Sequence, residues 1–178
     1  MATGLRAQVG GRTVTYDLAY AGNLIALVRG NELGLKVARE SFGALVAAGK
    51  NVKAQAQQSW VASAGRLGPW PEVVSCLMYA KLRPGRYRDL VVFRDFSVDR
   101  SPCGSCFAAL MAHLHATRRL RLDQWIECEN LLGLAFRGRL VARGGELVPQ
   151  LSGRAFITGE HRFRIDSRDP LRHGFQLA

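Results

Sequence analysis

Two cysteines, Cys103 and Cys106, mark the stretch of this chain that is best suited to chemistry. Residues 99–106 read Asp-Arg-Ser-Pro-Cys-Gly-Ser-Cys, between a short apolar run and a longer run without helix breakers. Ser101 is a favourable N-cap and Pro102 a favourable first helical residue, so we expect Cys103 in the first turn of a helix. The partial positive charge at a helix N-terminus favours a thiolate, which predicts a lowered pKa for the Cys103 thiol.

The backbone around Cys103 is also suited to an anion. Pro102 has no N–H, so the amides of Cys103, Gly104 and Ser105 would be the free donors of the first turn. Such donors point out of the helix N-terminus, and Gly104 allows a ligand to approach the backbone closely. We therefore expect a carboxylate-binding pocket with a reactive sulfur beside it.

The same residues carry a family resemblance. The segment from Asp99 to Ser105 resembles the second catalytic motif of the proline racemase and 4-hydroxyproline epimerase family. The family's proteins have two similar halves, and the Cys-Gly-His motif of their first half does not occur here, so the chain resembles the second half. Further segments match in the family's order along nearly all of the chain: Tyr16–Asn23, Leu114–Ala116, Glu129–Gly133, Phe136, Ile157–Gly159, Asp169–Pro170 and Gly174–Phe175.

The resemblance implies an amino-acid racemase or epimerase that acts on proline or a hydroxyproline-like substrate without pyridoxal phosphate or a metal. Inverting an α-carbon takes two acid/base groups, one on each face of the carbon. Cys103 would be one of them. The amides of Gly104 and Ser105 would hold the substrate carboxylate, and Asp99 would pair with the substrate ammonium, as the matching aspartate does in the family. A cysteine here, rather than the threonine of the family's dehydratase branch, favours inversion over loss of water.

The source of the second acid/base group is open. It would come from a separate polypeptide that resembles the family's first half, or from a second copy of this chain in a twofold dimer. The formal net charge of +11 favours an acidic partner over self-association.

Two other interpretations stay open. The chain departs from the family pattern at Cys106 and Arg118, where glycine is usual, and at Leu110, where arginine is usual. These departures are compatible with a truncated, non-catalytic remnant of the family. Cys103 and Cys106 also form a Cys-x-x-Cys pair at a predicted helix start, which is typical of redox proteins. A disulfide between them would remove the catalytic thiolate.

Composition narrows the remaining classes. Hydrophobic residues make up 48% of the chain, which excludes a disordered protein. We find no apolar run of membrane-span length and no signal peptide in Met1 to Tyr20, so we expect a cytoplasmic protein with reduced cysteines and no membrane partner. The lysines and arginines are scattered and lack the basic stripe with interleaved aromatics that nucleic-acid binding needs, so we expect no nucleic-acid partner.

The pattern of the chain predicts a single α+β domain over residues 1–178, resembling the C-terminal half of the family's proteins. Hairpin turns are expected at three glycine-containing sites, residues 10–11, 83–85 and 144–145. Helices are expected at 37–58 and 104–117, and a loop at 63–71. Other strands are expected at 23–28, 73–80, 90–93, 126–132, 135–142, 146–151 and 155–165. The resemblance adds the diaminopimelate epimerase-like fold, in which a curved mixed sheet or barrel wraps around a central helix.

Overall fold

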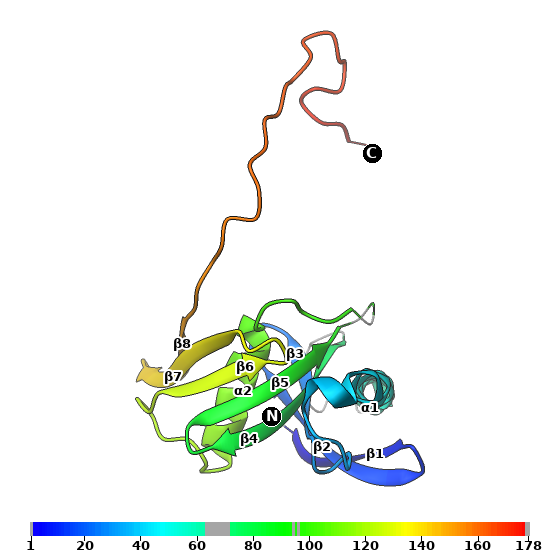
Figure 1. The fold of residues 1–178 in the computed structure, drawn as a ribbon, viewed down its shortest axis with the longest axis vertical. Helices are drawn as coiled ribbons and strands as arrows, with labels where there is room; N and C mark the ends of the chain where they lie inside the picture. The colour runs from blue at the N-terminus through cyan, green and yellow to red at the C-terminus, as the bar shows by residue number, and fades with distance from the viewer. Residues whose placement is uncertain (1, 63–71, 94, 96, 177–178) are drawn as a thin grey trace.

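A computed structural model describes residues 2–62, 72–93, 95 and 97–176 (Figure 1). Within these ranges the chain forms one sheet of eight strands, two α-helices and one short 3₁₀ turn. The elements are β1 (Ala2–Val9), β2 (Arg12–Tyr20), β3 (Leu24–Arg29), η1 (Arg39–Ser41), α1 (Phe42–Ala62), β4 (Val73–Arg83), β5 (Arg86–Val92), α2 (Gly104–Ala116), β6 (Ile126–Asn130), β7 (Ala135–Arg143) and β8 (Glu146–Ser152).

The strands lie side by side in chain order, from β1 at one edge to β8 at the other. The pairs β3–β4 and β5–β6 are parallel, and the remaining neighbours are antiparallel. Parallel neighbours need a crossover connection, and here each crossover holds a helix: α1 joins β3 to β4 and α2 joins β5 to β6. The predicted mixed α+β sheet is confirmed, and it is open rather than closed into a barrel.

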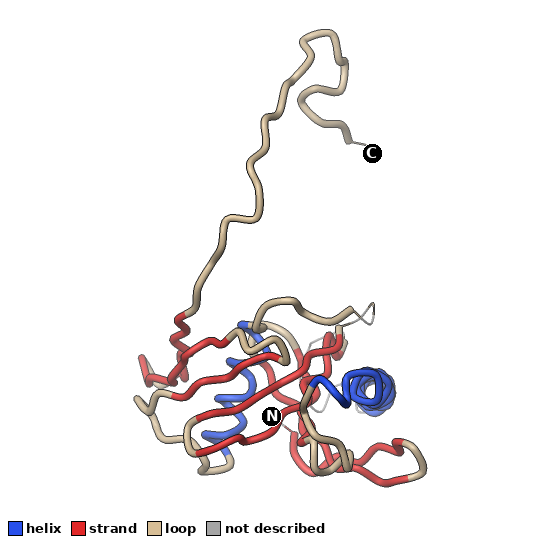
Figure 2. Tube along the Cα trace, viewed as in Figure 1, coloured by secondary structure: helices blue, strands red, loops and turns tan. Residues whose placement is uncertain are grey.

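The two helices cover opposite faces of the sheet (Figure 2). On β3, Leu24, Ala26 and Val28 pack in the apolar cluster around α1, whereas Ile25 and Leu27 pack in the cluster around α2. Side chains alternate between the faces of a strand, so a strand covered on both faces must be apolar at successive positions. This requirement explains the continuous apolar sequence of β3.

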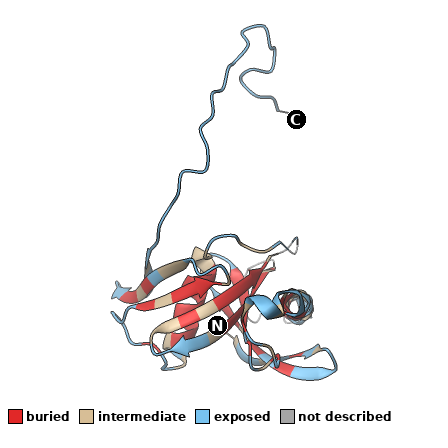
Figure 3. Cartoon of the chain, in the orientation of Figure 1, coloured by how far each residue is buried: buried red, intermediate tan, exposed pale blue. Residues whose placement is uncertain are grey.

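The sheet curves around α2. This helix contacts β2 and β3 towards one edge of the sheet and β7 and β8 at the other, which a flat sheet would not allow. The side chains of α2 are buried on nearly every side, as expected for a helix inside a curved sheet (Figure 3). These contacts agree with the expected curvature of the sheet around this helix.

The first helix differs in detail from its prediction. A 3₁₀ turn occupies its expected start, and α1 continues to Ala62. Leu45 is fully buried, whereas Phe42 is exposed because it is the first residue of α1 and precedes the part of the helix that lies on the sheet. Gly49 allows a close approach to the sheet, because a Cβ there would lie 2.8 Å from Cε of Met78.

The C-terminal residues overturn one prediction. No strand forms between residues 153 and 176, where every residue is exposed and the chain extends away from the sheet (Figure 1). The strand expected at 155–165 is therefore wrong for this chain alone, because no sheet edge lies beside it to accept its hydrogen bonds. We call residues 153–176 the C-terminal arm. The predicted loop at 63–71 lies outside the described residues, and within the described part no helix is long and apolar enough to cross a membrane.

Candidate active site

Cys103 is the N-cap residue of α2, and the helix begins at Gly104. The prediction that Ser101 caps the helix and Pro102 starts it is wrong, since both lie before the helix. The reason is backbone conformation. Cys103 is extended, with φ −94° and ψ 116°, which is the conformation of an N-cap residue and not of a helical turn.

The free amides of the first turn shift accordingly. The first helical hydrogen bond is donated by Phe107 N–H to the carbonyl oxygen of Cys103, at 2.9 Å. The amides available to a ligand or a thiolate are therefore those of Gly104, Ser105 and Cys106. Gly104 and Ser105 are thus among the free first-turn amides, as predicted. The third amide of the first helical turn is that of Cys106 instead of Cys103.

The Cys103 thiol has a pKa of about 7, below its ordinary value. The largest cause is a hydrogen bond with the thiol of Cys106, while partial burial of Cys103 acts in the opposite direction. The Ser105 hydroxyl, whose Oγ lies 3.5 Å from Sγ of Cys103, and the Cys106 backbone N–H favour the thiolate as well. The pKa of Cys103 is lowered, as predicted, and the hydrogen bonds from Cys106 and Ser105 account for the lowering.

Cys106 is the residue that sequence reasoning treated only as a departure or a redox partner. Its side chain is fully buried, and its Sγ lies 3.4 Å from Oγ of Ser75 on β4. The hydrogen bond with Cys103, and after it burial, raise the pKa of Cys106 well above its ordinary value, so Cys106 stays a thiol and acts as a donor. Ser75 was missed because it lies in an apolar strand pattern, where a small polar residue carries no chemical signal.

Asp99 lies within hydrogen-bonding reach of the Cys103 sulfur. Its side chain is half-buried, and a hydrogen bond with Cys103 partly offsets the burial that raises the pKa of the carboxyl. The segment around Asp99 is held by Asn130 at the end of β6, whose Nδ2 donates to the carbonyl of Arg100 at 2.8 Å. The Oδ1 of Asn130 accepts from the amides of Leu132 and Leu134, so this side chain links the Asp99 segment to the β6–β7 turn.

Asp89 on β5 adds a second carboxyl that sequence reasoning missed. It is 3% exposed, and its Oδ2 lies 3.4 Å from Sγ of Cys128 on β6. Burial, together with the smaller effects of Cys103 and Asp99, raises the pKa of Asp89 to about 7, although the hydrogen bond from Cys128 acts in the opposite direction. The available signal was a charged residue directly before the apolar run Leu90–Val92.

Two cavities adjoin the motif. One, of about 500 Å³, is lined by both Asp89 and Asp99, and the other, of about 690 Å³, is lined by residues 100–102 together with Phe136 and the start of the C-terminal arm. The described lining of the larger cavity ends at Pro102, one residue before Cys103. Cys103 itself is half-buried, and the described linings of these two cavities do not include it.

Comparison with known proteins adds to this geometry. Residues 2–176 match the proline racemase family. The chain belongs to the proline racemase family. It is 32% identical over 176 residues to the proline racemase of Clostridioides difficile, covering 93% of this chain and 51% of that protein. It is 33% identical over 177 residues to the 4-hydroxyproline 2-epimerase of Streptosporangium roseum, covering 92% of this chain and 51% of that protein.

Solved structures agree with the family assignment. The hydroxyproline epimerase from Agrobacterium vitis, solved with bound trans-4-hydroxy-L-proline, superposes with a TM-score of 0.77 at 27% identity. The superposition covers 99% of this chain and 52% of that one. The chain therefore spans about half the length of the relatives that it matches.

Proposed function

We propose that this chain provides one half of an amino-acid racemase or epimerase site for proline or a hydroxyproline-like substrate. In this proposal Cys103 is one of the two acid/base groups that exchange the α-proton. The observation that carries the proposal is the sulfur of Cys103 at the start of α2, half-buried, with a pKa of about 7. A group with a pKa near the working pH is both a competent base and a competent acid.

The neighbouring groups divide the other tasks. The amides of Gly104 and Ser105 lie in the first turn of α2, where a carboxylate is stabilised by unpaired N–H groups and by the helix dipole. The same interactions stabilise the negative charge that develops on the carboxylate when the α-proton leaves. Asp99, beside Cys103, would pair with the substrate ammonium. None of these steps calls on pyridoxal phosphate or a metal.

The second acid/base group must lie on the opposite face of the α-carbon, beyond the residues that hold the first. A polypeptide resembling the other half of the relatives, or a second copy of this chain, would supply it. The curved sheet around α2 supports a diaminopimelate epimerase-like fold for the chain. Its four free cysteines support the expected cytoplasmic location.

The direct test is exchange of the α-hydrogen of L- and D-proline and of 4-hydroxyproline with solvent deuterium. We expect wild-type chain to promote exchange when a polypeptide resembling the other half of the relatives is supplied. Cys103→Ser should lose at least about 100-fold of the rate, the range attributed to a positioned acid/base group. The same chain alone, at high concentration, tests a second copy as the partner. Exchange without inversion would indicate a single working thiol.

The proposal fails if Cys103→Ser exchanges the α-hydrogen as fast as wild type. It also fails if wild type promotes no exchange with any of these substrates, in the presence or absence of a complementary half. The second result would favour the non-catalytic remnant. Ser105→Ala serves as the matched substitution at the site, because it removes one hydroxyl donor and leaves the sulfur and both amides in place.

A further inference from the structure

A cavity of about 350 Å³ lies beside the C-terminal end of α2, whereas Cys103 lies at the start of that helix. Three cations from separate parts of the chain line this cavity: Arg29 at the end of β3, Lys81 on β4 and Arg119 after α2. The helix has 13 residues, so its two ends are about 20 Å apart. The cavity shares no described lining residue with the two cavities beside the Cys103 motif, and the proposed racemase chemistry does not use it.

The pairing of the strands gathers the lining side chains on the face of the sheet that α2 covers. Tyr79 and Tyr87 belong to the apolar cluster around α2. In the register of the sheet, Arg29 is paired with Tyr79 and Lys81 with Tyr87. Paired residues of neighbouring strands point to the same side, so both cations lie on this face as well. Because α2 ends at Ala116, the helix leaves these strand ends uncovered.

Arg119 is held at the cavity by side chains from the C-terminal end of α2. Its Nη2 donates to Nε2 of His113 at 2.7 Å, and its Nε donates to Oγ1 of Thr117 at 3.0 Å. His113 is 1% exposed, and its Nδ1 lies 3.4 Å from Oδ2 of Asp17. A cation after the C-terminus of a helix is favourable in itself, but that role does not explain the other two cations of the cavity.

The positive charge around this cavity is only partly compensated. Arg29 pairs with Glu32 at 3.4 Å, but the Arg29 side chain is 49% exposed, so the pair is weak. Within the described ranges, neither Lys81 nor Arg119 has a carboxylate partner, and no acidic residue is part of the cavity lining. Like charges around one cavity repel each other, and a bound anion would relieve that repulsion.

Two buried tyrosines add hydroxyl groups to the cavity. Tyr79 and Tyr87 are each 4% exposed and line the cavity, so they form its base, while the three exposed cations surround its mouth. The hydroxyl of Tyr79 lies 3.2 Å from Nε2 of His113, whereas that of Tyr87 hydrogen-bonds no residue in the described part of the chain. Burial raises the pKa of both hydroxyls and Arg119 opposes this rise, so the guanidinium group lies near both. An oxyanion would accept the hydrogen bond that the Tyr87 hydroxyl lacks.

We propose that this cavity binds a small tetrahedral dianion, either inorganic phosphate or the phosphoryl group of a phosphomonoester. The guanidinium groups of Arg29 and Arg119 present forked N–H donors that match phosphate oxygens, and Lys81 adds a point charge. Three cations attract two negative charges more strongly than the single charge of a carboxylate. A cavity of about 350 Å³ lies at the small end of the range for ligand pockets, which suits a ligand of this size. The site is independent of the proposed function, since its anion lies at the opposite end of α2.

The test titrates the full chain with inorganic phosphate in a calorimeter, with the ionic strength held constant by chloride. We expect saturable binding, competition by sulfate, and binding of acetate at least about tenfold weaker, because acetate carries one charge. Equal affinity for acetate and phosphate, or no saturable binding, would overturn the proposal. Glycerol 3-phosphate distinguishes the two sources of the dianion. Tighter binding than phosphate would assign the site to a phosphomonoester, and equal or weaker binding would assign it to free phosphate.

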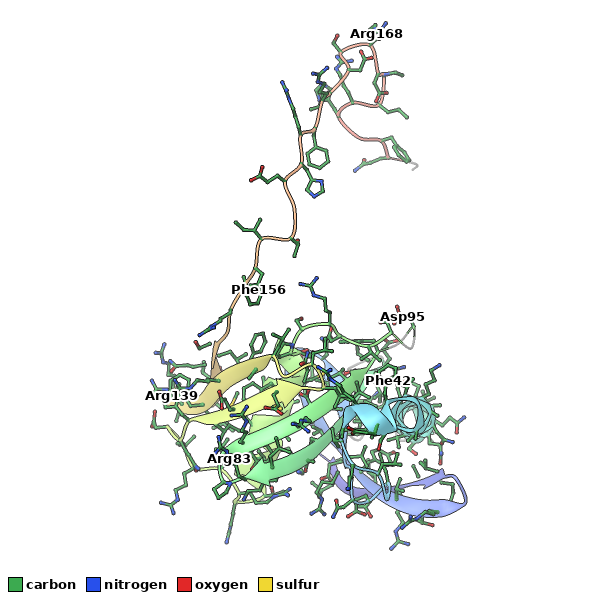
Figure 4. The ribbon with its side chains drawn as sticks, in the orientation of Figure 1. Phe42, Arg83, Asp95, Arg139, Phe156 and Arg168 are labelled. Carbon is green, nitrogen blue, oxygen red and sulfur yellow. The ribbon has the colours of Figure 1, made fainter. Side chains whose placement is uncertain are left out.

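Two variants on the same strand separate this site from the general attraction of a basic protein. Lys81→Gln removes a charge that lines the cavity and should weaken phosphate binding roughly tenfold. Arg83→Gln is the matched control, because Arg83 (Figure 4) lies two residues further along β4, is also exposed and is not part of the lining. Its loss should weaken binding by less than about twofold. Equal effects of the two substitutions would contradict a defined site. Both side chains are exposed, so neither change should impair folding.

Backbone amide NMR shows where the anion binds. We expect the largest phosphate-induced shifts at residues 29–31, 79–81 and 119, around the cavity. Shifts confined to residues 103–106 would place the anion on the first turn of α2 and overturn the proposal. Cys103→Ser should bind phosphate as wild type does, so this site and the proposed racemase function stand or fall separately.

Discussion

The Oγ of Ser75 lies 3.4 Å from the Sγ of Cys106, and Cys106 in turn hydrogen-bonds the sulfur of Cys103. Ser75, in the interior of the sheet, is thus connected through the buried thiol of Cys106 to the half-buried thiol of Cys103. A donor held in place by burial stabilises a thiolate more than a mobile one does, because no reorganisation is needed when the proton leaves. This relationship gives Cys106 a role in setting the pKa of Cys103.

The first prediction concerns Cys106→Ala. Removing the thiol donor should raise the pKa of Cys103 from about 7 towards its ordinary value, since the hydrogen bond with Cys106 is the largest cause of the lowering. A rise of one pKa unit reduces the thiolate fraction at pH 7 roughly fivefold. The measurement is the rate of Cys103 alkylation by iodoacetamide as a function of pH, followed by intact-protein mass, with Cys103→Ser as the blank.

Cys106→Ser is the matched control for this experiment. Its hydroxyl keeps a donor at the same position, so the alkylation profile should stay close to that of wild type. If the alanine and serine variants have the same profile as wild type, the hydrogen bond from Cys106 has no part in the reactivity of Cys103.

A second prediction concerns oxidation. Hydrogen peroxide would transfer oxygen to the Cys103 thiolate, giving sulfenic acid, and attack by the Cys106 sulfur would release water and close a disulfide. We expect wild type to lose alkylation at Cys103 and to recover it with dithiothreitol. Cys106→Ser should instead progress to irreversibly oxidised Cys103, because it has no resolving thiol. Equal recovery of the two proteins would remove the Cys103–Cys106 pair as a redox device.

The third prediction concerns Asp89, whose pKa is raised to about 7 by burial. Between its ordinary pKa and about pH 7, the folded protein keeps this proton and the unfolded chain releases it. The folded state binds more protons, so the stability that depends on Asp89 falls as pH rises through this window. Asp89→Asn should therefore gain on the order of 3 kcal/mol relative to wild type on going from about pH 5 to pH 8.

Urea unfolding at the two pH values measures this gain in the free energy of unfolding as the difference between variant and wild type. The pH dependence of titratable groups that both proteins share cancels in this difference. Asp166→Asn is the control. Asp166 is exposed on the C-terminal arm and the pKa of its carboxyl is lowered, so it is ionised throughout the window. A gain for Asp89→Asn no larger than for Asp166→Asn would show that the buried carboxyl does not titrate there.

The parts of the structure that follow from the sequence are those with local causes. Gly10 and Gly11 both have positive φ, at 55° and 77°, so the turn between β1 and β2 is set by two residues that accept this conformation. The same reasoning places the turn at Gly144 and Gly145. It also places the helix that begins at Gly104, because the run that follows contains no breaker.

The parts that sequence reasoning missed depend on distant partners. The strand expected at 155–165 does not form, because a strand also needs a sheet edge, and none lies beside this segment in the described part of the chain. Ser75 and Asp89 lie on β4 and β5, far from Cys103 in the sequence, and the packing of α2 on the sheet brings them near it. No local sequence pattern in β4 or β5 predicts that these residues lie near Cys103.

The last prediction concerns Arg118, which follows the end of α2 with φ 57°, a left-handed conformation. Glycine is the usual residue after a helix C-cap for this reason, and a side chain there costs roughly 1 kcal/mol. Arg118→Gly should therefore stabilise the protein by about 1 kcal/mol or slightly less, because glycine also increases the freedom of the unfolded chain.

Arg121→Gly is the matched control, because it removes the same charge at an exposed site where φ is negative. This variant should lose about 0.5–1 kcal/mol of folding stability. Thermal or urea unfolding of the two variants gives the answer, and stabilisation by both, or by neither, would contradict a strained backbone at Arg118.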